Sequence, residues 1–200
     1  MTNLLDNWLD AESAKMLAEV AKQKGISLCG IQRDQTTADF RYADLKPPEA
    51  ILLASDLLQA GVTGSLTSLN LGENQLCGLD KYEDGTYSAE GITAIADALR
   101  VNGSLTSIDL SKNALTNYGR DMTGIKQLAA ALGVNGSLTV LILWRNDLED
   151  EGVSAICEAI QSNKETKLAS LNFGDNGIGP VGATAVAAMV AVTGSLTKME

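Results

Sequence analysis

The sequence predicts an α/β solenoid, in which one short strand and one helix recur along the chain. Three observations predict it: an apolar pattern L-x-x-L-x-L-x-x-N-x-L that occurs four times, a helix-like pattern after each copy, and a common underlying spacing. Repeated units of this kind stack, so that their strands form one parallel sheet and their helices pack behind it. Because strands lie closer together than helices, we expect a horseshoe with the sheet on the concave face and the helices on the convex face.

The repeated pattern sets the frame of the solenoid. Its copies start at Leu66, Leu105, Leu138 and Leu168, and a fifth starts at Leu196. Within a copy the apolar residues alternate, which is typical of a strand. Each copy is followed by a segment such as GITAIADAL from Gly91, whose apolar residues at positions 2, 5 and 9 line one face of a helix. The starts are 39, 33, 30 and 28 residues apart, and insertions account for the longer steps, so the underlying period is 28.

Two of these insertions lie between a strand and its helix. The first copy carries 11 additional residues there, including Tyr82–Tyr87, and the second carries five, including Tyr118. Both fall on the same rim of the predicted solenoid. We therefore expect them to form a second candidate surface, with neutral variation in loop length as the alternative.

The chain before Leu66 has no full copy of the pattern. Helical periodicity covers residues 10–23 and 49–60, and Leu28–Ile31 is expected to form a short strand. We expect Trp8 and Leu9 to cover the end of the core. The predicted organisation is a helical cap and degenerate repeat over residues 1–65, followed by four complete repeats and the start of a fifth over residues 66–200.

Two further details bear on the frame. Phe40 and Leu45 keep the spacing that Leu71 and Leu76 have in the first full copy, which places a degenerate strand before Phe40. The phrase Gly-Ser-Leu-Thr recurs after the predicted helices, and its glycines are expected to supply left-handed turns that end them. Those glycines are Gly64, Gly103, Gly136 and Gly194.

The four in-frame copies resemble the ribonuclease-inhibitor-like class of leucine-rich repeats, over about residues 28–200. In this pattern the asparagine of each copy is expected to turn inward and bond backbone groups of the loops, since unpaired buried polar groups cost about 1–3 kcal/mol each. These asparagines are Asn74, Asn113, Asn146 and Asn176. A structural role is expected for them rather than a catalytic one.

The charge of the chain limits the kinds of partner to expect, and its cysteines indicate the compartment. The chain has 15 basic and 25 acidic residues and a net charge of −10, which disfavours nucleic acid and anionic membrane surfaces as partners. It has no apolar run long enough for membrane insertion and no secretory signal pattern. Cys29, Cys77 and Cys157 are odd in number and far apart, so we expect no disulfide framework and an intracellular location, in the cytoplasm.

The sequence gives little support for catalysis. It contains no histidine, which removes the commonest general base and most zinc sites. Gly177–Gly182 reads G-x-G-x-x-G, a dinucleotide-binding pattern, but its glycines keep the frame of the repeat and too little chain follows it. The first insertion loosely resembles a calcium loop, yet Gly91 stands where the bidentate glutamate belongs. We therefore expect no enzyme, no cofactor and no metal.

One strand differs from the others on the face turned to solvent. The third copy places Val140, Ile142, Trp144 and Arg145 there, whereas the other copies place small and polar residues at the same positions. Tryptophan and arginine are the residues that most often anchor interfaces, and exposed apolar patches mark contacts. We expect a protein-binding hot spot at Trp144. Its expected polar rim comprises Asp109, Lys112, Asn172 and Asp175.

The predicted function is that of a non-enzymatic protein–protein interaction module or a structural subunit of a larger assembly, binding through the concave strands and adjoining loops. A tolerated apolar stripe, or one covered by an insertion of the same chain, remains the alternative for the Trp144 patch. The alternative function is a GTPase-activating regulator, because Ran GTPase-activating protein has this kind of repeat and Arg145 is an exposed arginine on the strand–loop edge. A small-ligand enzyme is a third, disfavoured reading. The fifth copy stops within its strand, which predicts contact of this uncapped end with another chain.

Overall fold

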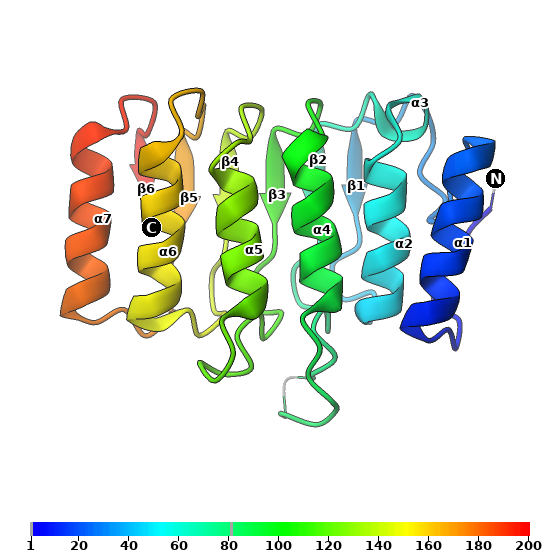
Figure 1. Cartoon of the computed structure of the whole chain (residues 1–200), viewed down its shortest axis with the longest axis horizontal. Helices are drawn as coiled ribbons and strands as arrows, with labels where there is room; N and C mark the ends of the chain where they lie inside the picture. The colour runs from blue at the N-terminus through cyan, green and yellow to red at the C-terminus, as the bar shows by residue number, and fades with distance from the viewer. Residues whose placement is uncertain (1, 81) are drawn as a thin grey trace.

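Strands and helices alternate along the chain in the computed structural model, which describes residues 2–80 and 82–200 (Figure 1). The described strands are β1 (Thr37–Asp39), β2 (Ser68–Asn70), β3 (Ser107–Asp109), β4 (Val140–Ile142), β5 (Ser170–Asn172) and β6 (Lys198–Met199). The described helices are α1 (Ala11–Lys24), α2 (Pro47–Leu57), α3 (Ala60–Thr63), α4 (Glu90–Val101), α5 (Thr123–Leu132), α6 (Glu149–Ser162) and α7 (Pro180–Val192). In this part of the chain no helix has the length and apolar character that crossing a membrane requires.

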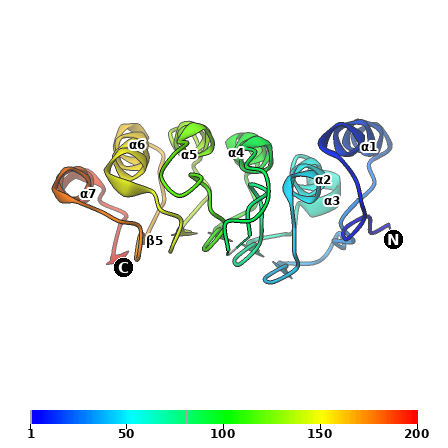
Figure 2. The same cartoon turned by 90° about the horizontal axis from the view of Figure 1, so that it is seen from below.

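The strands form one parallel sheet in the order β1-β2-β3-β4-β5-β6, so each repeat pairs with the next along the chain. The register aligns equivalent positions: Leu69 pairs with Ile108, Ile108 with Leu141, and Leu141 with Leu171. Seen from below, the helices form one layer and the strands the other (Figure 2). The row of strands is also shorter than the row of helices, as a solenoid with a concave sheet requires (Figure 1). The predicted fold class is confirmed.

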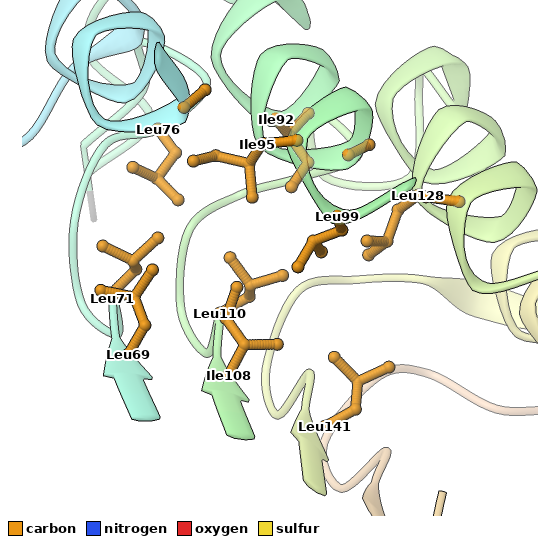
Figure 3. Packing of buried hydrophobic residues seen from close by; sticks show 14 of the residues in the cluster. Leu69, Leu71, Leu76, Ile92, Ile95, Leu99, Ile108, Leu110, Leu128 and Leu141 are labelled. Carbon is orange, nitrogen blue, oxygen red and sulfur yellow. The ribbon is translucent and has the colours of Figure 1, made fainter. Parts of the chain in front are cut away.

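The core lies between these two layers. Leu69, Ile108 and Leu141 point from their strands toward the helices, where Ile95 and Leu99 meet them from the inward face of α4 (Figure 3). All five side chains are at most 1% exposed. Full burial of such a side chain contributes about 1.5–3 kcal/mol, and the repeat provides the same contacts in each unit.

The asparagine that follows each full strand bonds the loop backbone across two repeats. Asn113 donates from Nδ2 to the carbonyls of Leu71 at 2.9 Å and Leu110 at 3.2 Å, while its own amide donates to Oδ1 of Asn146 at 2.9 Å. Asn146 repeats this arrangement with the carbonyls of Leu110 and Leu143. Since these side chains are nearly fully buried, they supply partners that the loop backbone would otherwise lack.

A second row of asparagines, which the sequence pattern did not predict, lies at the opposite ends of the helices. Asn135 donates from Nδ2 to the carbonyl of Leu99 at 2.7 Å and accepts at Oδ1 from the amide of Leu138 at 2.9 Å. Asn102 and Asn163 make equivalent bonds to the preceding repeat. The expected left-handed glycine turns are wrong: none of the four Gly-Ser glycines has a positive φ. The asparagine side chain connects helix to strand instead.

The N-terminal segment differs from the expectation at two points. Leu28–Ile31 is not a strand of the sheet; a single antiparallel bridge joins Asn3 to Cys29. The amides of Leu28 and Cys29 donate to the carboxylate of Asp56, which diverts this apolar run from strand pairing. The strand of the degenerate repeat is β1, directly before Phe40, as the spacing of Phe40 predicted.

Trp8 does not cover the end of the core, since its side chain is fully exposed. Leu4, Leu5 and Leu9 pack against the core in its place. Asp10 caps the start of α1, with Oδ1 accepting from the amide of Ser13 at 2.8 Å. Leu9 therefore fills the covering role that was expected of both residues.

Candidate functional site

Strand β4, which belongs to the third full repeat, presents an apolar surface on the sheet face away from the helices. Leu141 is buried in the core, whereas Val140 and Ile142 on either side of it are half-buried and face the other way. The register places Val140 between Ser107 and Ser170, and Ile142 between Asp109 and Asn172. The two apolar side chains are thus flanked on both sides by polar ones.

Trp144 extends this surface toward the edge of the sheet. Nζ of Lys112 lies 4.8 Å from the centre of the Trp144 ring, a cation–π contact. On the side of the next repeat, a Cβ added to Gly174 would lie 3.0 Å from Cδ1 of Trp144. The half-buried ring therefore lies between a lysine and a glycine, in a position fixed before any partner binds.

The turn after β4 lacks a side-chain-to-backbone hydrogen bond that the other full repeats share. Asp109 accepts at Oδ1 from the amide of Ser111 at 2.8 Å, and Asn172 accepts likewise from the amide of Gly174 at 2.8 Å. Asn70 makes the same bond to Gly72. Ile142 occupies this position in the third repeat and offers no acceptor. The third full repeat thus has a half-buried apolar side chain at the position where the others make a turn-stabilising bond.

A row of charged residues borders this surface at the carboxyl ends of the strands. Each residue of this row directly precedes the buried asparagine that follows a full strand, and each has a left-handed φ between 51° and 58°. The row consists of Glu73, Lys112, Arg145 and Asp175. The amides of the first three donate to the next repeat: Glu73 N to Ser111 O at 2.8 Å, Lys112 N to Trp144 O at 2.9 Å and Arg145 N to Gly174 O at 3.0 Å. The shared conformation aligns these side chains in one row along the edge.

Ion pairs link neighbours in this row. Nζ of Lys112 lies 3.1 Å from Oε2 of Glu73, and Nε of Arg145 lies 3.6 Å from Oδ2 of Asp175. Arg41 also contacts Glu73. Desolvation alone would raise the pKa of Glu73, but the bonds from Arg41, Tyr42 and Lys112 outweigh it and lower that pKa to about 2.

The structure brings most of the expected site residues together. Val140, Ile142 and Trp144 lie on one strand and its turn, with Lys112 against the tryptophan ring and Arg145 paired to Asp175. Asp109 and Asn172 flank Ile142, but their side-chain oxygens bond their own turns. Asn172 also donates to Glu200 at 2.8 Å. These two residues are therefore less available to a partner than the sequence suggested.

A carboxylate of the same chain fills the anion-binding position of the G-x-G-x-x-G segment. The amides of Gly179 and Gly182, at the start of α7, donate to Oδ1 of Asp150 at 2.8 and 2.7 Å. A carboxylate of the preceding repeat thus occupies the place at a helix N-terminus where a phosphate would bind. The three cysteines are free and buried, and burial raises the pKa of Cys77 and Cys157 to about 12.

The last repeat exposes an apolar surface of its own. Helix α7 buries Gly182 and Met189, while Val181, Val190 and Val192 are 66%, 45% and 61% exposed. A hollow of about 390 Å³ lies between α6 and α7, lined mainly by carbon. Strand β6 forms the outer edge of the sheet beside it.

Comparison with known families supports the architecture. Residues 134–157 and 164–187, each of which spans one strand and most of its helix, match the family described as Leucine Rich repeat. These two matches support membership of a leucine-rich-repeat family. No curated protein matches the chain.

Proposed function

We propose that this leucine-rich-repeat solenoid is a non-enzymatic module, or a subunit of a larger assembly, that binds a protein partner through the Trp144 face. This face comprises Val140, Ile142 and Trp144, with Lys112 and Arg145 at its edge. The observation that carries the proposal is Ile142. The first, second and fourth full repeats stabilise the turn after the strand with an asparagine or aspartate. The third full repeat has an apolar side chain on the solvent side instead and lacks that bond.

The geometry suits a contact of this kind. The Trp144 ring is held by Lys112 and by the space above Gly174, so little side-chain entropy is lost when a partner covers it. The row of ion pairs borders the apolar centre with charge along one edge, as part of the polar rim that usually accompanies a hot spot. A partner that buries this ring would draw about 2 kcal/mol or more from it.

The proposal is tested by comparative capture from the native source. The full chain, Trp144→Ala and Trp8→Ala are immobilised and the bound proteins are quantified. Trp8→Ala is the matched control, because Trp8 is fully exposed and lies outside the sheet. We expect one protein to be retained by the wild type and by Trp8→Ala and lost from Trp144→Ala. Equal retention by all three removes the Trp144 face as the binding surface.

The alternative function is a GTPase-activating regulator that would use Arg145. The exposed position of its guanidinium on the strand–loop edge favours this reading, and its 3.6 Å pairing with Asp175 would have to open. Hydrolysis of GTP by small GTPases with the wild type and with Arg145→Ala separates the two functions. Acceleration that disappears in Arg145→Ala would replace the binding role with a regulatory one.

A second contact is proposed at the face of α7. A helix that is apolar all round is usually covered on both sides, and Val181, Val190 and Val192 have no such cover among the described residues. Another chain seated on the side of α7 away from α6, where Val190 lies, would also pair with the outer edge of β6. Sedimentation of the full chain and of Val190→Asp tests this: a self-associated species that the variant abolishes supports a second copy, and a monomer in both cases argues against one.

The compartment and the subclass complete the proposal. Three free, buried thiols fit a reducing intracellular compartment such as the cytoplasm. The net charge of −10 makes nucleic acid an unfavourable partner. A full helix in every complete repeat fits the ribonuclease-inhibitor-like subclass.

A further inference from the structure

The two insertions enclose a hollow at the carboxyl edge of the sheet. The loops that carry them project from the same edge, below α4 and α5 (Figure 1). The hollow measures about 620 Å³. Its lining includes Tyr82 of the first insertion, Tyr118 of the second, Tyr42 of the degenerate repeat, and Leu79. Three of the four tyrosines of the chain thus gather at one place.

Bonds between the insertions hold the hollow in shape. The hydroxyl of Tyr118 donates to the carbonyl of Asp80 at 2.8 Å, which joins the second insertion to the first. The hydroxyl of Tyr87 donates to the carbonyl of Leu115 at 3.0 Å and fixes the first insertion to the next repeat. A site that exists before binding has less ordering cost to meet when a ligand enters.

Asp147 is the charged group of the hollow without a partner. It is half-buried, and among the described residues no donor lies within hydrogen-bond distance of its carboxylate. Desolvation raises its pKa first, followed by the negative charges of Asp175, Glu149 and Glu83, while Arg145 acts in the opposite direction. This carboxylate is in a place where an additional positive charge would be stabilising.

The other charged groups of the hollow are already engaged. Glu73 pairs with Arg41 and Lys112, and Oδ1 of Asp80 accepts from two amides of its own loop. Lys112 is held between Glu73 and the Trp144 ring, and Arg145 pairs with Asp175. What remains for a ligand is the Asp147 carboxylate, with the ring of Tyr118 beside it in the lining. Both favour a cation, and the chain as a whole is acidic.

We propose that this hollow receives the cationic side chain of an arginine or lysine from the protein partner, with Asp147 as its ionic contact and Tyr82 and Tyr118 as its walls. The proposal rests on the proposed function, in that the ligand belongs to a protein. A guanidinium already lies over a tyrosine at this edge: Cζ of Arg41 is 5.0 Å from the centre of the Tyr42 ring. The hollow would add a charge-specific contact beside the apolar Trp144 face.

The test uses a single residue as the probe. N-acetyl-arginine amide is titrated into the full-length, isotope-labelled chain and the backbone amide shifts are followed; N-acetyl-citrulline amide is the uncharged isostere. We expect saturable shifts around Asp80, Tyr118 and Asp147 with the arginine probe, and binding weaker by about tenfold or more with citrulline. Asp147→Asn should weaken binding of the arginine probe by a similar factor, because asparagine keeps the shape and tolerates the left-handed backbone at φ 53°.

The control variant is Asp97→Asn, in a surface pair with Arg100 on α4, which should leave probe binding unchanged. Equal binding of both probes, no saturable shift, or undiminished binding by Asp147→Asn would overturn the proposal. Trp144→Ala separates it from the proposed function, since Trp144 is not part of the described lining. A chain that binds the probe but retains no protein contradicts the proposed function alone, and one that retains a protein but does not bind the probe contradicts the hollow alone.

Discussion

The ring of Trp144 occupies the space that a side chain at residue 174 would fill. A Cβ at Gly174 would lie 3.0 Å from Cδ1 of Trp144 and 3.2 Å from Oδ1 of Asn172. The absence of a side chain in the fourth repeat therefore sets the position of the largest side chain in the third. This relationship connects two neighbouring repeats within the proposed binding face.

The first prediction follows from that contact. Gly174→Ala should displace the Trp144 ring by a few tenths of an ångström, because the new methyl group meets it directly. Stability should change by less than about 1 kcal/mol, since the ring lies at the surface, whereas partner affinity should fall by about tenfold. Tryptophan fluorescence in a Trp8→Phe background would report the displacement. Unchanged fluorescence and affinity would show that Gly174 does not position the ring.

Asn146 should be among the most sensitive polar residues of the fold. Asn146→Ala removes two donated bonds, to the carbonyls of Leu110 and Leu143, and one accepted from the amide of Asn113. At about 1 kcal/mol for each bond, we expect a loss of about 3 kcal/mol in the free energy of unfolding. Urea denaturation measures it, with the exposed Asn7→Ala as control. A loss below about 1 kcal/mol would contradict the structural role given to this row.

The shape of the hollow should depend on Gly85. Its φ is 122°, and a Cβ there would lie 2.1 Å from the carbonyl oxygen of Gly78, so alanine cannot be accommodated without moving backbone. We expect Gly85→Ala to speed amide exchange at Asp80, whose amide bonds the carbonyl of Asp84, and to weaken binding of N-acetyl-arginine amide. Global stability should change little, because the insertion lies outside the repeat core.

The matched control for that experiment is Gly103→Ala, since a Cβ at Gly103 meets nothing within 4 Å. It should leave both exchange at Asp80 and probe binding as in the wild type. If Gly85→Ala also leaves exchange and probe binding unchanged, the close approach of Gly85 to the carbonyl of Gly78 is not what maintains the hollow.

Glu73 should make the stability of the chain depend on pH in the acid range. Its pKa is lowered from 4.5 to about 2 in the folded chain, so the folded state favours the charged form. The stabilisation is therefore complete above about pH 4.5 and is lost as the pH falls toward 2. Urea titrations of the wild type and Glu73→Gln should differ most near neutral pH and converge at the acid end. A difference that does not change between pH 6 and 2 would contradict the pairing with Arg41 and Lys112.

The repeat frame could be predicted from the sequence because the structure of each unit is determined by residues within that unit and its neighbours. The leucines, the strand position and the helix all follow from patterns within about 28 residues, and stacking adds only nearest-neighbour contacts. The second row of asparagines had a signal as well: Asn102 and Asn135 precede Gly-Ser-Leu-Thr in the same frame. The glycine of this phrase was expected to end each helix, but the φ values of these glycines show no left-handed turn.

What could not be predicted depends on contacts between distant residues. Leu28 and Cys29 have an apolar, strand-like sequence, but Asp56 captures their amides from 27 or 28 residues away. The hollow requires Tyr118 to reach the carbonyl of Asp80 across 38 residues. The length of each insertion could be read from the chain, but not the way in which the two meet.

The central claim is that the Trp144 face binds a protein, and partner affinity measures it most directly. Once the retained protein is identified, its dissociation constant is determined with the wild type, Trp144→Ala and Trp8→Ala by isothermal titration calorimetry. The account predicts a loss of about 2 kcal/mol or more, roughly thirtyfold in affinity, for Trp144→Ala and no change for Trp8→Ala. Equal dissociation constants for all three chains would contradict it.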